Sequence, residues 1–253
     1  MLRIDVVTIF PGMLEPPLGD GIVRRARERG LVEVGVHDLR DFTTDKHRSV
    51  DDAPFGGGPG MVMSAEPFHR AVDHLLPDGA GAQAAVVLLS PRGRRFDQAA
   101  AVRYAGLRRL VLLAGRYEGV DERVAQHLAT EELSLGDFVL TGGEVAALAV
   151  CEAVIRLLPG ALGDACSAEA DSFSDGILDH PHYTRPATVR ERSVPEVLLS
   201  GDHERVRRWR RKQALRATRD RRPELLAAAA LSAEDRELLR EIENEEPLSL
   251  RAS

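Results

Sequence analysis

Short apolar runs alternate with helical stretches from Leu2 to Leu158, and this alternation constrains the fold more than any other feature of the chain. We expect strands at 2–9, 31–37, 84–90, 110–114 and 137–140. We expect helices at 19–29, 65–75, 97–104, 121–129 and 143–158. Strands that alternate with helices of this length predict an α/β domain with a largely parallel sheet.

The pattern changes after Pro159-Gly160, a pair that ends a helix because proline cannot continue the hydrogen-bond ladder. Residues 161–184 are rich in small and polar residues and predict a flexible linker. From residue 185 the periodicity is helical, with segments at 195–199, 203–219, 223–231 and 233–243, the last one capped by Ser232. We therefore expect an α/β domain over 1–160, a linker over 161–184 and a small all-helical domain over 185–253.

Charge is unevenly distributed along the chain. The whole sequence has 34 basic and 40 acidic side chains, a net charge of −6, but residues 185–222 hold 13 basic against 5 acidic, a net +8. With so few acidic partners nearby, the helix at 203–219 predicts a phosphate-binding surface of the kind that binds nucleic acid. Its candidate contacts are Arg207, Arg208, Arg211 and Lys212. The alternative is a solvated helix whose charges only keep it soluble.

Composition excludes several other classes of protein. The longest apolar stretches, 84–89 and 146–151, are far shorter than the roughly 18 residues of a membrane span, and charged residues within the first five argue against a signal peptide. A cytoplasmic protein is expected. Cys151 and Cys166 show no metal-binding spacing and are predicted to be free thiols. The eight histidines, His180 and His182 included, also lack ligand spacing and are assigned to the surface or to loops.

Four glycine-containing segments stand out: 55–61, 88–94, 114–119 and 134–144. None has the spacing of a dinucleotide-binding or triphosphate-binding loop, so a nicotinamide or nucleoside triphosphate site has no support. Glycine lets backbone groups approach a ligand closely, and ligands of α/β sheets lie beyond the carboxyl ends of strands. Each loop alone is an ordinary turn. Together, loops at consecutive strand ends predict one pocket for an adenine or amino-acid moiety.

The order of several motifs resembles one family over nearly the whole chain. The motifs are Ile9-Phe10-Pro11, Val50-Asp51-Asp52 followed by Gly56-Gly57-Gly58-Pro59-Gly60-Met61, Gly115-Arg116-Tyr117-Glu118-Gly119-Val120-Asp121-Glu122-Arg123, Gly136-Asp137-Phe138-Val139-Leu140-Thr141-Gly142-Gly143-Glu144 and His182-Tyr183-Thr184-Arg185-Pro186. The chain is similar to bacterial tRNA (guanine-N1)-methyltransferases of the SPOUT class, which modify guanine 37 beside the anticodon. The resemblance implies a SPOUT-type parallel-sheet domain with a trefoil knot, S-adenosylmethionine as cofactor, tRNA as partner and a homodimer.

The resemblance also implies roles for individual residues. The residues implied to bind S-adenosylmethionine are Leu88, Leu89, Ser90, Pro91, Gly93, Gly115, Tyr117, Glu118, Gly119, Leu135, Gly136, Leu140, Gly142 and Gly143. Glu118 is also a candidate neighbour of Mg²⁺, and Arg92 departs from the residue expected in its loop. Asp51 is implied to accept a hydrogen bond from the guanine edge, and Arg185 to contact RNA.

For catalysis the resemblance implies Asp171 as general base and Arg156 as its helper. The chemistry needs such a base because guanine N1 carries a proton at neutral pH, and N1 cannot attack a methyl group until that proton leaves. A guanidinium would stabilise the negative charge that develops on guanine O6. Two alternatives remain open: a non-catalytic RNA-binding or regulatory protein with the same fold, and a related knotted methyltransferase of ribosomal RNA.

Overall fold

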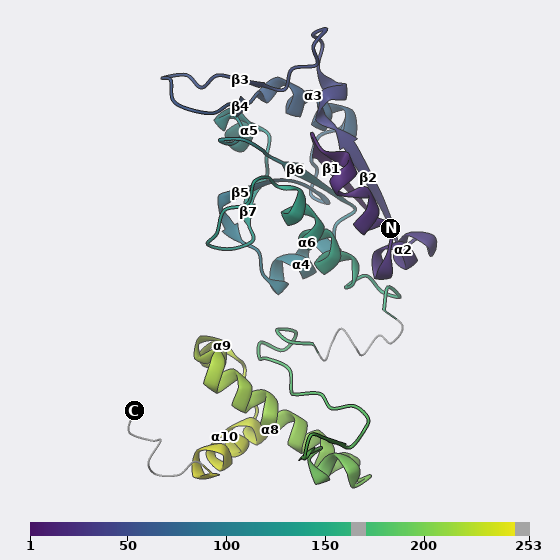
Figure 1. Cartoon of the computed structure of the whole chain (residues 1–253), viewed down its shortest axis with the longest axis vertical. Helices are drawn as coiled ribbons and strands as arrows, with labels where there is room; N and C mark the ends of the chain where they lie inside the picture. Colours follow the sequence, from purple (N-terminus) through teal and green to yellow (C-terminus); the bar gives the residue numbers. More distant parts are fainter. Residues whose placement is uncertain (163–170, 246–253) are drawn as a thin grey trace. The chain divides into compact units, whose positions relative to one another are not determined.

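The computed structural model describes residues 1–162 and 171–245, and the chain divides into two compact units, Met1–Ala165 and Cys166–Ser253 (Figure 1). The first unit contains β1 (Leu2–Thr8), α1 (Glu15–Leu18), α2 (Gly21–Glu28), β2 (Val32–Asp38), β3 (Asp51–Asp52), β4 (Val62–Met63), α3 (Ala65–Leu75), β5 (Ala84–Arg95), α4 (Gln98–Ala105), β6 (Arg109–Ala114), α5 (Glu122–His127), β7 (Glu131–Ser134) and α6 (Glu144–Ile155). The second contains β8 (Thr188–Val189), β9 (Arg192–Ser193), α8 (His203–Arg221), α9 (Pro223–Ala228) and α10 (Ala233–Glu245). Short 3₁₀ helices lie at Pro11–Met13, Leu39–Phe42 and Glu196–Leu199.

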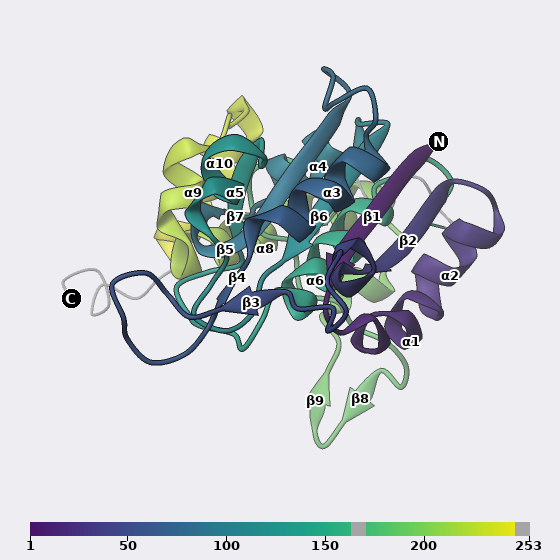
Figure 2. The ribbon, with the colours of Figure 1, turned by 90° about the horizontal axis from the view of Figure 1, so that it is seen from above.

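A parallel sheet forms the centre of the first unit, and the predicted α/β class is confirmed. Its strand order is β2-β1-β6-β5-β7, and each neighbouring pair is parallel (Figure 2). Strand β1, an inner strand of the sheet, is buried along almost its whole length because both of its faces are covered by helices. A parallel sheet brings the carboxyl ends of its strands to one edge, where glycine loops follow β6 and β7 and where the 88–94 segment forms the carboxyl-terminal half of β5.

Helices cover both faces of this sheet. The larger core lies between one face and helices α2, α4 and α6, and includes Ile4, Leu112 and Val150. The second core lies between the other face and helices α3 and α5, and includes Val7 and Phe68. Figure 1 shows α3 and α5 on one side of the sheet and α4 and α6 on the other. The nearly uniform apolar sequence of α6 follows from its position, because it is buried against the sheet.

One predicted strand, at 137–140, is wrong. The last strand of the sheet is β7, whereas Phe138 and Val139 lie in an exposed loop, with 56% and 86% of their surfaces accessible. β7 escaped prediction because it begins with two glutamates. These form ion pairs with guanidinium groups, Glu131 with Arg103 and Glu132 with Arg92, so this edge strand does not show an apolar pattern.

The second unit contains helices α8, α9 and α10, which pack around a small core of Ile177, Ala214, Leu215, Leu238 and Ile242. The prediction that this part is all-helical is wrong, because β8 and β9 form an antiparallel hairpin (Figure 2). The hairpin turn places Arg190 and Glu191 at positive φ (46° and 66°). Such turns ordinarily use glycine or asparagine, so the residue types at 190 and 191 did not predict this hairpin.

Part of the segment predicted as linker packs on the helical unit. Ile177 is buried in its core, and the backbone N–H of Leu178 donates to the hydroxyl of Thr218 at 2.9 Å. Asp175 forms an ion pair with Arg211 of α8. Residues 171–178 are therefore anchored to α8. Cys166 lies outside the described residues, whereas Cys151 is a free thiol within α6, where burial raises its pKa to about 12.

Candidate active site

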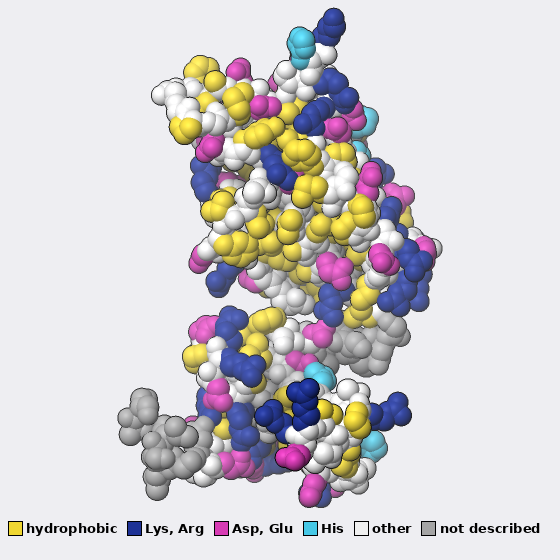
Figure 3. All heavy atoms as spheres, in the orientation of Figure 1, with side chains coloured by type: hydrophobic (Ala, Val, Ile, Leu, Met, Phe, Trp, Pro, Cys, Tyr) yellow, Lys and Arg dark blue, Asp and Glu magenta, His cyan; other side chains and the backbone are white. Residues whose placement is uncertain are grey.

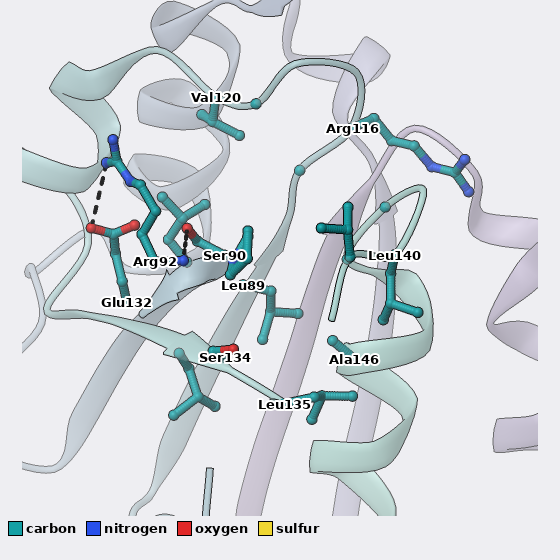
Figure 4. Close-up of a pocket in the computed structure, with 18 of the residues that line it drawn as sticks. Leu89, Ser90, Arg92, Arg116, Val120, Glu132, Ser134, Leu135, Leu140 and Ala146 are labelled. Carbon is teal, nitrogen blue, oxygen red and sulfur yellow. Dashed lines mark hydrogen bonds and ion pairs between the residues drawn. The ribbon is translucent and has the colours of Figure 1, made fainter. Parts of the chain in front are cut away.

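Three of the glycine loops converge on one cavity of about 360 Å³ in the first unit. Every residue expected to bind the cofactor lines it except Gly93: Leu88, Leu89, Ser90, Pro91, Gly115, Tyr117, Glu118, Gly119, Leu135, Gly136, Leu140, Gly142 and Gly143. The 114–119 and 134–144 loops follow β6 and β7, as expected for a site at the carboxyl edge of a parallel sheet, whereas the 88–94 segment lies within β5, where its pairing with β7 shifts register. In Figure 4, Leu89, Leu135, Leu140 and Ala146 surround a shared space.

Glycine is required where two of these loops meet. A Cβ atom at Gly143 would lie 2.7 Å from the Cα of Ala114. The backbone N–H of Gly143 donates to the carbonyl of Gly115 at 2.9 Å. The loop before α6 therefore packs directly against the loop after β6. Tyr117, in the second of these loops, has φ of 62°. A non-glycine residue in this region is strained by about 1–3 kcal/mol, and such strain is concentrated at functional sites.

A buried ion pair joins the same two loops. Glu144 is 1% exposed and accepts hydrogen bonds from the Thr8 hydroxyl at 2.8 Å and from Arg116 Nε at 3.1 Å. The Arg116 guanidinium also lies 4.6 Å from the ring centroid of Phe10. Figure 4 shows the Arg116 side chain directed away from Leu89 and Leu135. The sequence analysis assigned no role to Arg116 or Glu144, although both belong to the motifs that it quoted.

Three charged residues at the cavity have distinct environments. Glu118 packs against the 55–61 loop, because a Cβ at Gly60 would lie 2.4 Å from its Oε1. Arg92 forms an ion pair with Glu122 at 2.6 Å, which raises the pKa of Arg92. Glu132 Oε1 lies 3.7 Å from Arg92, while its Oε2 is buried without a hydrogen-bond partner in the described part of the chain. Sequence reasoning missed Glu132, which lines the cavity.

Gly93, Asp51 and Arg156 do not line this cavity. Gly93 has a packing role: its Cβ would lie 2.2 Å from the backbone nitrogen of Leu133, so β5 can pass β7 only with glycine there. Asp51 lies in the two-stranded sheet of β3 and β4. Arg156 is the residue that ends α6.

Asp171 belongs to the second unit, where it lines a cavity of about 220 Å³ together with Arg207, Arg210 and Arg211. A further cavity of about 380 Å³ in this unit is lined by Tyr183 and Arg185 of the quoted motif and by Trp209 of α8. The rings of Tyr183 and Trp209 are tilted, with centroids 6.3 Å apart. The motif thus packs beside the basic helix.

The assumption that α8 lacks acidic partners is wrong, because helix α10 supplies them. Arg207 pairs with Glu204 and Glu234, Arg208 with Glu234, Glu237 and Glu241, Arg211 with Asp235, and Lys212 with Glu241 and Glu245. The bond from Arg211 lowers the pKa of Asp235 to about 2, although burial opposes this shift. In Figure 3 basic and acidic side chains are interspersed on this unit. Within 1–162 and 171–245, Arg185, Arg205 and Arg210 make no ion pair.

The fold and this cavity define an α/β protein with a ligand-sized site at the carboxyl ends of parallel strands, joined in one chain to a helical unit with a basic helix. A family model described as tRNA (Guanine-1)-methyltransferase TrmD matches residues 2–228. The chain therefore belongs to the tRNA (guanine-1)-methyltransferase family, and the resemblance found in the sequence is confirmed.

Curated relatives are similar in sequence to this chain along nearly its full length. A protein of Moorella thermoacetica is 54% identical over 245 residues, 97% of this chain and 98% of its own. One from Dehalococcoides mccartyi is 51% identical over 245 residues, with the same shares. One from Geobacter sulfurreducens is 51% identical over 244 residues, 96% of this chain and 99% of its own. Each is named tRNA (guanine-N(1)-)-methyltransferase.

Proposed function

We propose that this protein transfers a methyl group from S-adenosylmethionine to N1 of the guanine at position 37 of tRNA, 3′ of the anticodon. The observation that carries the proposal is the convergence of the three glycine loops on one cavity in a chain of this family. A non-catalytic RNA-binding protein would have no need of such a cavity. The relatives named as tRNA methyltransferases support tRNA rather than ribosomal RNA as the substrate.

The cavity residues fit S-adenosylmethionine. A volume of about 360 Å³ lies in the usual range of small-molecule sites, roughly 300–1,000 Å³. Apolar side chains such as Leu88, Leu135 and Leu140 suit an adenine ring, and Glu132 contributes a carboxylate to the cavity lining. When bound, this cofactor supplies a methyl group on a sulfonium sulfur. Glu118 and Glu132 also offer carboxylates to a Mg²⁺ ion, which often uses one or two protein carboxylates and otherwise keeps water.

For the chemical step we assign the proton at guanine N1 to the Asp171 carboxylate. As that proton moves to Asp171, the N1 lone pair forms the new bond to the methyl carbon, and the bond between that carbon and sulfur breaks. Arg156 stabilises the negative charge that develops on guanine O6. General-base catalysis typically contributes a factor of about 10²–10⁴, which sets the expected effect of removing the carboxylate.

The second unit, Cys166–Ser253, is assigned to tRNA binding. It contains the segment expected as the tRNA-binding domain, 185–253, together with most of the segment expected as a linker, 161–184, while the cofactor domain was expected over 1–160. Arg185 of the quoted motif and Arg210 of α8 both line the cavity beside Trp209 and make no ion pair in the described ranges. Free guanidinium groups beside an aromatic ring suit a phosphate backbone and an unstacked base. Arg207, Arg208, Arg211 and Lys212 contribute once a phosphate displaces their carboxylate partners, and Asp51 accepts from the guanine edge.

The proposal includes a trefoil knot, a homodimer and a cytoplasmic location, where tRNA is found. The close crossing of Gly93 and Leu133 and the packing of Gly143 on Gly115 support a knotted path. Exposed apolar side chains in the loop before α6, Phe138 and Val139 among them, support a dimer, since large exposed apolar patches mark interfaces. Figure 3 shows hydrophobic side chains gathered on the visible face of the first unit. In the described chain, no helix combines the length and apolar character needed to span a membrane.

The test uses tritiated S-adenosylmethionine and two tRNA transcripts that differ only at position 37. We expect label in the transcript with guanine there and none in the other. Asp171→Asn should bind S-adenosylhomocysteine and tRNA as the unaltered protein does, and should lose at least about 100-fold in single-turnover rate. Glu191→Gln, which changes an exposed acid of the same unit, is the matched control. Label in neither transcript would refute the catalytic proposal, and an unchanged rate for Asp171→Asn would refute the assigned base.

A further inference from the structure

A cluster of metal-ligating side chains lies outside the proposed active site. Among the described residues, Asp179, His180 and His182 are the one group of three whose ligand atoms lie within 4.8 Å of one another. His182 Nε2 is 2.7 Å from Asp179 Oδ2, and His180 Nε2 is 3.8 Å from Asp179 Oδ1. The two imidazole rings have centroids 4.4 Å apart. Both rings therefore direct Nε2 toward the same carboxylate.

The hydrogen bonds of His180 determine which of its nitrogens carries a proton. His180 Nδ1 lies 3.2 Å from the carbonyl oxygen of Pro181, and a carbonyl can only accept, so Nδ1 carries the hydrogen. In the neutral ring Nε2 then has a lone pair. That lone pair faces a carboxylate oxygen at 3.8 Å, a distance at which two acceptors repel each other. A cation between them, either a proton or a metal ion, would make the contact favourable.

We propose that Asp179, His180 and His182 form a binding site for a divalent transition metal, with Zn²⁺ the best match. Two imidazoles and one carboxylate are a donor set of catalytic zinc sites, whereas Mg²⁺ and Ca²⁺ prefer oxygen ligands throughout. This site is separate from the carboxylates of the cofactor cavity, and the histidine spacing alone did not predict it.

The surroundings of the three side chains suit a metal site in which some coordination positions are left to water. His182 is 71% exposed on its side chain, so one side of the cluster is open to water. Hydrogen bonds orient two of the ligands, as outer partners do in metal sites. His180 Nδ1 donates to the carbonyl of Pro181, and Asp179 Oδ1 accepts from the backbone N–H of His180. Arg210 lines the cavities on both sides of His180, and its positive charge opposes a second cation. We therefore expect moderate rather than very tight affinity.

Metal binding here would stabilise the segment that carries Asp171. The backbone N–H of Asp179 donates to Ser172 Oγ at 2.9 Å, and Ser172 directly follows Asp171. A metal that holds Asp179 between two histidines would fix this turn at one end, while Ile177 fixes it to the helical core. The binding itself does not depend on the proposed methylation, so failure of either proposal leaves the other to be judged by its own assay.

The test is a calorimetric titration of full-length, chelator-treated protein without a histidine tag, using Zn²⁺ alone. We expect one ion per chain, and Co²⁺ should give the visible absorption of a histidine-bound ion. His182→Gln should weaken binding by more than the roughly 10-fold that loss of an outer partner costs, as should Asp179→Asn. Since His182 is exposed, its variant is expected to fold normally.

Two controls separate this site from other sources of binding. His203→Gln alters an exposed histidine at the start of α8 that is outside the cluster, and it should bind Zn²⁺ as the unaltered protein does. Cys166→Ser should also retain binding, because the proposed site uses no thiol. Absence of one bound Zn²⁺ per chain, or equal affinity in His182→Gln, would overturn the proposal.

Discussion

Replacing Glu144 with glutamine is expected to destabilise the α/β unit, because Glu144 is the buried partner of Arg116. Glutamine keeps the shape of the side chain but removes its charge. Hydrogen bonds to charged groups contribute about 1.5–3 kcal/mol, against about 0.5–1.5 kcal/mol for neutral ones. Arg116 is 16% exposed on its side chain and would lose its counterion with little access to water, which adds to the loss. We therefore expect the free energy of unfolding to fall by about 1–3 kcal/mol.

Urea denaturation of the full-length protein measures this effect, with far-UV circular dichroism reporting the α/β transition. Trp209, the one tryptophan of the chain, lies in α8, so its fluorescence reports on the helical unit and should not shift. Because Glu144 joins the loops before α6 and after β6, affinity for S-adenosylhomocysteine should fall as well. Thr8→Val is the comparison variant: it removes the hydroxyl bond to the Glu144 carboxylate and the bond that this hydroxyl accepts from the Phe10 N–H, and it leaves the ion pair in place.

A double-mutant cycle with Arg116→Met isolates the ion pair. If the pair contributes as argued, Glu144→Gln should cost much less in the Arg116→Met background than in the unaltered protein. An unchanged urea midpoint for Glu144→Gln, or the same loss in both backgrounds, would refute the reasoning.

Three further predictions follow from the packing and charges. Gly93→Ala should lower the free energy of unfolding by about 1–3 kcal/mol, and with it the melting temperature, because the added Cβ would collide with the backbone of β7. Gly81→Ala is the control, since a Cβ there would meet no atom within 4 Å and should leave the melting temperature unchanged. Equal melting temperatures for the two variants would contradict this prediction. Burial raises the pKa of Asp5, but the hydrogen bond from His37 and the nearby guanidinium groups of Arg109 and Arg3 lower it by more, so the net pKa lies below 3.8. Its stabilising effect is therefore complete above pH 3.8 and lost as pH falls through the lower folded pKa, so the difference in melting temperature between unaltered protein and Asp5→Asn should shrink below pH 3.8. Arg210→Ala should weaken tRNA binding and reduce its salt slope by about one without altering thermal stability; an unchanged slope would exclude a phosphate contact.

Local patterns predicted most elements of the first unit. Helix α3 spans Ala65–Leu75 as its apolar periodicity predicted, and the strands β1 and β6 agree to within a residue. The failures are elements stabilised by distant partners. β7 consists partly of glutamates whose arginines lie on other elements, and the turn of the β8–β9 hairpin uses residues that do not favour positive φ.

The same distinction applies to the site. Glycine loops after consecutive strands predicted a shared cavity because parallel strands place their carboxyl ends at one edge. Glu132 was missed because the sequence does not reveal that one oxygen of this edge-strand glutamate lacks a hydrogen-bond partner. The pairing of α8 with α10 was missed because the charge count ended at residue 222. A signal was present, since Glu234, Glu237, Glu241 and Glu245 recur at helical spacing and align with the arginines of α8.

The acidic face of α10 has a consequence for how this protein selects among polyanions. Its carboxylates are tethered to the helix they neutralise, so a phosphate that takes Arg208 or Lys212 must displace a competitor with a high effective concentration. A short or loosely held polyanion offers too few contacts at once to do so. An RNA that places several phosphates along α8 can exchange the whole set of pairs together. If α8 binds tRNA as proposed, the acidic face of α10 therefore raises the threshold for binding and favours a long, shaped RNA over free phosphate.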